Sequence, residues 1–130
     1  MDRDEILRRP LVAVFAVVRP DGRVHATPLW FHWDGNDLNL IVERDSRRHR
    51  WAVEAGRAAV CVETVEAGEL AFVTAEGPIT VVDPLTAEAR YRMWERYVGP
   101  ERARTVVDGG GHETKVLLVL HPETWIPAGA

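Results

Sequence analysis

The sequence is poor in cysteine and lysine, and it has no long apolar run. Cys61 is the single cysteine among 130 residues, which excludes an internal disulfide framework and a zinc site with several thiolates. It lies in the apolar run AAVCVE, which favours a buried, unreactive thiol. No apolar stretch approaches the ~20 residues that span a bilayer, and the first segment, MDRDEILRRP, is too charged for a secretory signal. We therefore expect a cytoplasmic protein with no membrane partner.

The chain also has no excess of positive charge. Its 16 basic and 20 acidic residues give a net charge of −4, which argues against general affinity for nucleic acid. Lys115 is the only lysine, and four of the arginines fall within seven residues: Arg44, Arg47, Arg48 and Arg50. A local anion site can exist on an acidic protein, because attraction at contact distance depends on the nearest charges.

The composition, 46% hydrophobic and 28% charged, is typical of one soluble globular domain, which we place at 1–130. Apolar periodicity and turn residues predict helices at 2–9, 46–56 and 84–98, another helical turn or two in 101–108, strands at 11–18, 23–33, 37–43, 57–65, 69–77, 78–83 and 114–122, and a tail at 123–130. The first strand is apolar on both faces, which predicts a strand covered on both sides. Strands joined mostly by short turns indicate an antiparallel barrel with peripheral helices.

Two helices carry terminal signals. Ser46 is suited to cap the helix at 46–56, and Gly56 fits the position after its last turn. Asp83 and Pro84 are suited to the N-cap and first positions of the helix at 84–98. We therefore expect the middle helix to begin directly beside the group of arginines.

The segment HATPLWFHWDG raises a question, because Pro28 sits inside a predicted strand and cannot donate to a ladder. Before this proline the apolar residues are Val24 and Ala26, and after it they are the odd-numbered Leu29 and Phe31. One extra residue would switch the inward face, so we predict a bulge at Thr27-Pro28 with backbone groups free for a ligand. The alternative is that the proline only bends a barrel strand.

These residues resemble a known family. The strand T-P-L-W-F, an Asp-Gly turn, a second strand and S-R-R at the head of a helix are similar to the split β-barrel flavoproteins related to pyridoxamine 5′-phosphate oxidase, which include F420-dependent reductases. The similarity covers 10–82 in order and, more weakly, the final strand with Trp125. It implies a mainly β (α+β) fold, a six- to seven-stranded antiparallel split β-barrel with short peripheral helices. It also implies a homodimer with one flavin-type cofactor, FMN or F420, in each of two grooves between subunits.

The resemblance also implies cofactor-binding residues. Thr27, Pro28, Leu29 and Trp30 would lie along the ring, Val42 and Glu43 near the ribityl chain, and Ser46, Arg47 and Arg48 at the phosphate. The last assignment agrees with the physics of the segment, because helix N-terminal N–H groups and guanidinium forks both suit phosphate oxygens. The alternative for these arginines is a solvated surface run. Trp30 is equally suited to stand beside a flavin and to pack in a dimer.

The chain departs from the family pattern in two respects. Arg48 stands where many relatives have lysine, which still suits phosphate. Pyridoxamine phosphate oxidase itself is longer and grips its substrate with a C-terminal arginine and histidine, whereas this chain ends with PETWIPAGA. We therefore do not expect that activity, and the small-molecule substrate stays unassigned.

Other chemistries lack support in the sequence. His25 and His32 face opposite sides of a regular strand, and no third ligand is evident, so we expect no metal site. No Ser-His-Asp or Cys-His arrangement can be argued from the spacing, and no G-x-G-x-x-G sequence follows a strand into a helix. No side chain can be named as a general acid or base.

The function that we expect is hydride transfer between FMN or F420 and a small organic substrate, in which the cofactor carries the chemistry. One alternative is a non-enzymatic dimeric binding or carrier protein for a flavin, haem or another planar ligand. A third is an interaction domain without a cofactor.

Overall fold

The computed structural model describes residues 1–127. The helices are α1 (Arg3–Leu7), α2 (Arg47–Ala55), α3 (Ala87–Val98) and α4 (Pro100–Asp108), with a 3-10 turn η1 (His112–Thr114). The strands are β1 (Ala13–Val18), β2 (Val24–Leu29), β3 (His32–Trp33), β4 (Leu38–Glu43), β5 (Arg57–Glu66), β6 (Glu69–Val82), β7 (Lys115–Leu120) and β8 (Thr124–Ile126). The fold is mainly β with short helices, as predicted.

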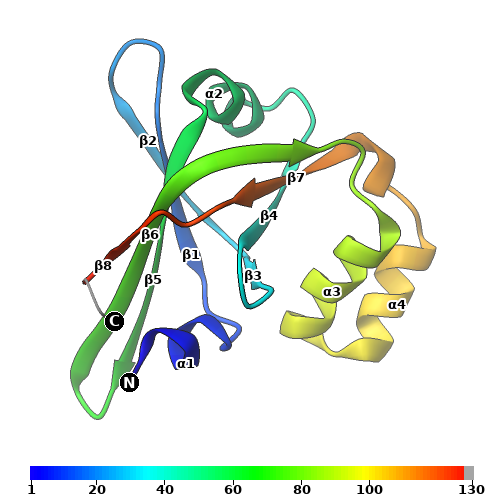
Figure 1. The fold of residues 1–130 in the computed structure, drawn as a ribbon. Helices are drawn as coiled ribbons and strands as arrows, with labels where there is room; N and C mark the ends of the chain where they lie inside the picture. Colours follow the sequence, from blue (N-terminus) through cyan, green and yellow to red (C-terminus); the bar gives the residue numbers. More distant parts are fainter. Residues whose placement is uncertain (128–130) are drawn as a thin grey trace.

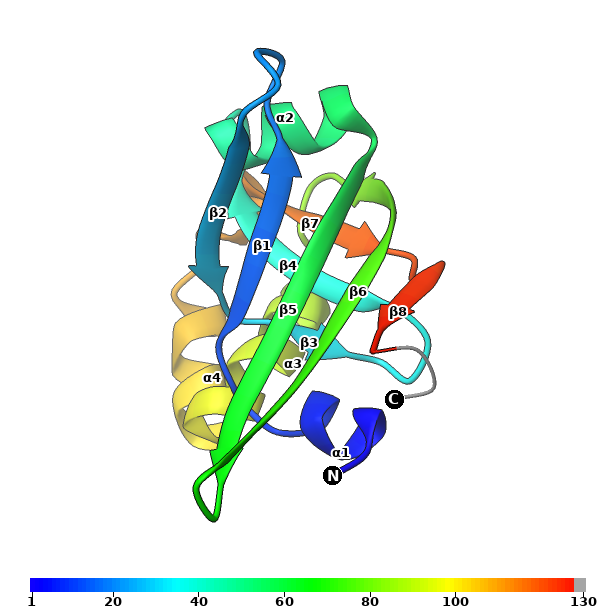
Figure 2. The same ribbon diagram turned by 90° about the vertical axis from the view of Figure 1, so that its left-hand side faces the viewer.

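The strands pair in the order β2-β1-β5-β6-β7-β4-β3, with β8 on β6, and every pairing is antiparallel. The strands β2, β1, β5 and β6 lie side by side in front of β7, β4 and β3 (Figure 2). The helix α2 lies over one end of the barrel, whereas α3 and α4 form a pair at its side (Figure 1). Within residues 1–127 the edge strands β2 and β3 are not paired with each other, so the barrel is split on this side, where β2 faces β3 and β4.

The long strand β6 connects the two halves of the barrel. It pairs with β5 as far as Pro78 and with β7 from Ile79 onward, so the two predicted strands at 69–77 and 78–83 are one continuous strand. Gly77 lies at this crossing, and a Cβ built there would stand 1.9 Å from the carbonyl oxygen of His121. Only glycine permits this approach of two backbones.

The core fills the inside of the barrel and comes from alternate residues of each strand. In β1 the buried residues are Ala13, Phe15 and Val17. The strands β4 and β7 alternate in the same way, with Leu40 and Leu118 fully buried. One face of every long strand thus points into a single apolar interior, as period-two patterning requires.

The other face of β1 is not covered by residues 1–127, contrary to the prediction. Val14 and Val18 are 41% and 54% exposed, and Cys61, which pairs with Val14, is only partly buried. The apolar character of this face therefore has another cause than burial within one chain.

The prediction of a bulge at Thr27-Pro28 is wrong. The strand β2 pairs with β1 residue for residue, so Thr27 stands opposite the buried Phe15 and the odd-numbered residues face inward throughout. Pro28 is tolerated because β2 has a neighbour on one side only. Val24 and Ala26, which suggested a parity change, belong to the exposed apolar face.

Helix ends follow their capping residues. The Ser46 hydroxyl accepts a hydrogen bond from the His49 N–H at 3.3 Å, and Gly56 ends α2 in the left-handed region with φ 73°, both as predicted. The helix α3 starts later than predicted, because Thr86 rather than Asp83 is its N-cap and accepts from the Ala89 N–H.

The C-terminal segment, predicted to be a tail, contains β8, in which Trp125 pairs with Ala75 of β6; positions 128–130 of that predicted tail lie outside the described residues. Trp125 packs edge-on against Trp33 with ring centroids 5.7 Å apart.

No helix in the part of the chain that the structure describes is both long and apolar enough for a transmembrane span.

Candidate functional site

A cavity of about 450 Å³ and a smaller one of about 230 Å³ lie on different parts of the barrel. The larger is a shallow hollow on the exposed apolar face, around Ala16, Val18 and Val24. The smaller lies at the split and is lined by Leu29, Trp30, Ile41, Arg90, Met93, Trp94 and Lys115. The smaller cavity is the better candidate for a specific site, because apolar walls there surround a few polar groups.

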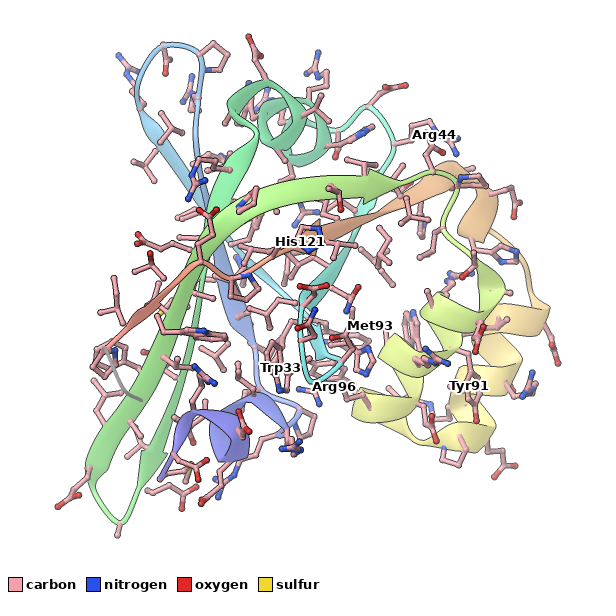
Figure 3. All side chains as sticks on the ribbon, viewed as in Figure 1. Trp33, Arg44, Tyr91, Met93, Arg96 and His121 are labelled. Carbon is pink, nitrogen blue, oxygen red and sulfur yellow. The ribbon has the colours of Figure 1, made fainter. Side chains whose placement is uncertain are left out.

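The position of α3 beside this cavity is fixed by Arg96. Its Nε donates to the Phe31 carbonyl oxygen at 2.8 Å, and its Nη2 donates to the Arg9 carbonyl oxygen at 2.5 Å. Figure 3 shows Arg96 between α1, β3 and α3, with Met93 on the side of α3 that faces the strands. One guanidinium thus ties three segments together through backbone carbonyls, and it holds the cavity wall in place.

A cluster of aromatic side chains forms one wall of the cavity. Trp30 stacks on Tyr97, and Trp94 meets Trp30 edge-on with ring centroids 4.9 Å apart. The Tyr97 hydroxyl accepts from the Phe31 N–H at 3.0 Å and donates to the Leu11 carbonyl oxygen at 2.7 Å. Burial raises the pKa of Tyr97, so the hydroxyl stays protonated and able to donate. Trp30 is therefore held in one orientation beside the cavity.

The opposite wall is the end of β4 and the start of β7. Ile41 lines the cavity there, and Lys115 forms an ion pair with Glu43. Val42 lies between Ile41 and Glu43 in β4, but its side chain is 2% exposed and belongs to the core. Only its backbone can therefore contact a ligand. The structure therefore brings Leu29, Trp30 and the Glu43 ion pair to one cavity.

The head of α2 follows β4 after three residues. Arg47, Arg48 and His49 form its first turn, which contains no acidic residue. The side chains of Arg47, Arg48 and Arg50 form no hydrogen bond or ion pair with any residue of 1–127. Cations at a helix N-terminus are unfavourable by about 0.3–1 kcal/mol each. This segment therefore suits a bound anion, whose charge would offset both the arginines and the helix dipole.

Of the arginines grouped in the sequence, Arg44 has a structural role. Its Nε donates to the Asp83 carboxylate at 3.0 Å, and its Nη2 donates to the Glu113 carbonyl oxygen at 2.8 Å. Hydrogen bonds from Arg44 lower the pKa of Asp83 below its ordinary value. The carboxylate that was expected to cap α3 is therefore bound to Arg44, and Thr86 caps the helix instead.

The middle of α2 contacts the start of β2. The His25 ring of β2 contacts the Trp51 ring of α2 with centroids 4.9 Å apart. The Thr27 hydroxyl, on the same inward face of β2, is shielded from solvent and has no hydrogen-bond partner within residues 1–127. Pro28, by contrast, lies on the exposed outer face. Of the nine residues expected at the cofactor, Leu29 and Trp30 line the small cavity. The other seven do not line it: Thr27, Pro28, Val42, Glu43, Ser46, Arg47 and Arg48.

Sequence reasoning missed the residues that α3 and β7 contribute. Arg90, Met93 and Trp94 all line the cavity. Positions three and four apart on a helix share a face, so the spacing of these residues marks one face of α3. The contact between Trp94 and Trp30 joins residues far apart in the sequence, so no local pattern predicts it.

Comparisons with known proteins agree with this architecture. Residues 3–127 match the sequence profile of the family described as Pyridoxamine 5'-phosphate oxidase. No curated protein sequence is significantly similar to the chain. An F420 reductase structure superposes with a TM-score of 0.78 at 22% identity, covering 96% of each chain. A conserved hypothetical protein from Mycobacterium tuberculosis gives 0.78 at 24% identity, covering 96% of this chain and 82% of the other.

A haem storage protein from Vibrio cholerae has the same fold. Its TM-score is 0.71 at 15% identity, covering 93% of this chain and 87% of the other. At such identities the superpositions establish the fold alone, whereas the profile match spans nearly the whole described chain. The chain belongs to the pyridoxamine 5′-phosphate oxidase family.

Proposed function

We propose that this protein is an FMN- or F420-dependent oxidoreductase that transfers a hydride between the bound cofactor and a small organic substrate. The observation that carries the proposal is the head of α2, where Arg47 and Arg48 stand beside a capped helix N-terminus without an anionic partner in residues 1–127. Three residues separate α2 from the end of β4, where Glu43 pairs with Lys115 beside the aromatic cavity. A phosphate site and an aromatic site are thus joined by one short segment.

The residues present fit such a cofactor. Arg47 and Arg48, with the first N–H groups of α2, would hold the phosphate through charge-assisted hydrogen bonds. The unpartnered Thr27 hydroxyl offers a hydrogen bond to a polar ring edge.

When bound, the flavin or deazaflavin ring supplies the redox chemistry. The protein would contribute binding and orientation: the arginines would hold the phosphate end, and the strand β2 beside Thr27 would orient the ring. A second subunit would exclude water from the groove, which strengthens the electrostatic contacts inside it.

We also propose that the protein is a homodimer, and the exposed apolar face supports this. Val24 of β2 is 66% exposed and Phe72 of β6 is 41% exposed, on the same outer face as Val14 and Val18. An exposed sheet face with several large apolar side chains is typical of a protein-protein interface. A second copy of the same face would cover it and would bury Cys61.

The experiment that tests the function is a spectroscopic titration of the purified protein with FMN and, separately, with F420. The proposal expects saturable binding of at least one cofactor, followed by reoxidation of its reduced form when small organic acceptors are added. Protein that binds neither cofactor would exclude the proposed function.

The second candidate is a dimeric carrier of a flavin, haem or another planar ligand. It is supported by the likeness of the fold to a haem storage protein, and it would use the same groove. Tight binding of FMN, F420 or haem without turnover of any acceptor would favour the carrier over the enzyme.

A further inference from the structure

The guanidinium of Arg90 is a buried charge without a counter-ion. Arg90 is 9% exposed, and it is the only charged residue among the buried residues of 1–127. Its Nη1 donates to the Gly110 carbonyl oxygen at 2.5 Å. Its Nε is shielded from solvent and has no hydrogen-bond partner within those residues. No carboxylate of the described chain forms an ion pair with it.

Such an arrangement is unfavourable unless something else compensates it. A buried ion loses its hydration, and the loss is recovered only through a partner of opposite charge or a full set of hydrogen bonds. One carbonyl satisfies one of the five N–H groups of the fork. Glu113 is exposed and forms no ion pair with Arg90, so it does not serve as the partner. The site therefore calls for an anion from outside residues 1–127.

The same side chain lines the cavity at the split, which indicates what the anion is attached to. The volume of about 230 Å³ is enclosed mostly by Leu29, Ile41, Met93 and the Trp30–Trp94 pair. Pockets for drug-sized ligands run to about 300–1,000 Å³, so this cavity suits a single ring. The other cation of the cavity, Lys115, is already paired with Glu43.

We propose that this cavity binds an aromatic carboxylate of one ring, with its carboxylate on Arg90 and its ring against Trp30 and Trp94. A guanidinium fork matches a carboxylate, and indole faces and edges match an aromatic ring. The identification of this molecule as the substrate rests on the proposed function. The binding itself requires only residues of this chain.

The test is a calorimetric titration with benzoate and with its neutral analogue benzamide. It uses the wild-type protein, Arg90→Met, Arg90→Lys and the control Arg102→Met, which removes an exposed arginine of α4 outside the cavity. We expect Arg90→Met to weaken benzoate binding by about tenfold or more, because a charge-assisted pair is lost. The benzoate affinity of Arg90→Lys should lie between those of Arg90→Met and the wild type, and the benzoate affinity of Arg102→Met should match that of the wild type. Benzamide should bind weakly to all four proteins.

A thermal melt of each variant separates binding from folding. Arg90→Met replaces an unpaired buried charge by an apolar chain of similar length, so its melting temperature should not fall. Equal benzoate affinity in Arg90→Met and the wild type would overturn the proposal. A shift of Arg90→Met to monomer with unchanged benzoate affinity would also overturn it, because the guanidinium would then be paired across an interface.

Repeating the titration with saturating FMN or F420 separates this inference from the proposed function. Benzoate that is displaced by the cofactor would overturn the inference, because the cavity would belong to the cofactor. A protein that binds neither cofactor but binds benzoate through Arg90 would keep the inference and lose the proposed function.

Discussion

Trp30 stacks on Tyr97 with ring planes 6° apart and centroids 4.3 Å apart. This contact joins the segment between β2 and β3 to α3, across 67 residues of sequence. Since Trp30 also lines the cavity, the stacking decides how an indole is presented to a ligand. Packing of α3 and the shape of the candidate site are thus one feature.

Removing the Tyr97 hydroxyl should destabilise the protein. Tyr97→Phe keeps the ring stacked but leaves the Phe31 N–H and the Leu11 carbonyl oxygen without their partner. The free energy of unfolding should fall by about 1–3 kcal/mol, as measured by urea unfolding. Tyr91→Phe is the matched control, because the Tyr91 hydroxyl forms no hydrogen bond in the described residues. Equal stability of the two variants would contradict this account of the contact.

The strand crossing at Gly77 should not tolerate a side chain. Gly77→Ala places a methyl group 1.9 Å from a backbone oxygen of His121, and backbone on both sides resists the shift. We expect a loss of about 3 kcal/mol or more, or failure to fold. Gly109→Ala is the control, because its nearest neighbour stands at 3.4 Å and its φ is −74°. Thermal melts compare the two variants, and a stable Gly77→Ala protein would exclude a close crossing.

Stability should depend on the ionisation of His32. Burial first, and then the charge of Arg96, lower the pKa of His32 below 6.5. The unfolded chain therefore binds a proton at a higher pH than the folded chain, so stability is complete above pH ~6.5 and falls as the pH drops through the interval down to the folded pKa. His32→Gln should lose this part of the pH dependence in urea unfolding at pH 7 and pH 5. An NMR titration of the His32 ring that gives a pKa at or above 6.5 would contradict the assignment.

The exposed apolar face should hold two copies together. Val14→Glu places a charge at its middle, next to Cys61 and Pro28, and a charge inside an apolar interface is strongly unfavourable. Sedimentation should show a dimer for the wild type and a monomer for this variant. The control Val53→Glu changes a valine of α2 that is 58% exposed and should remain dimeric. A monomeric wild-type protein would refute the proposed dimer.

Local signals predicted much of this fold, and contacts between distant segments explain the rest. Ser46 and Gly56 set the ends of α2 through their own hydrogen bonds and backbone conformation, so their neighbours in sequence were sufficient. The interpretation of Val24 and Ala26 was wrong because apolar residues mark a buried core and an exposed apolar face alike.

The candidate site was predictable only in part. The helix head that bears Arg47 and Arg48 follows from local sequence. The role of Arg44 depends on Asp83, 39 residues away, and that of Arg90 depends on which strands α3 covers. Side chains brought together by the topology carry no signal in periodicity.

The affinity of FMN and F420 for the wild type, Arg48→Glu and Arg102→Glu tests the central claim most directly. Arg48→Glu turns an attraction for phosphate into a repulsion at the head of α2, and contacts to charged groups contribute about 1.5–3 kcal/mol. We expect the bound cofactor to lose about tenfold or more in affinity, with unchanged unfolding and with Arg102→Glu equal to the wild type. Equal cofactor affinity in all three proteins would contradict the account.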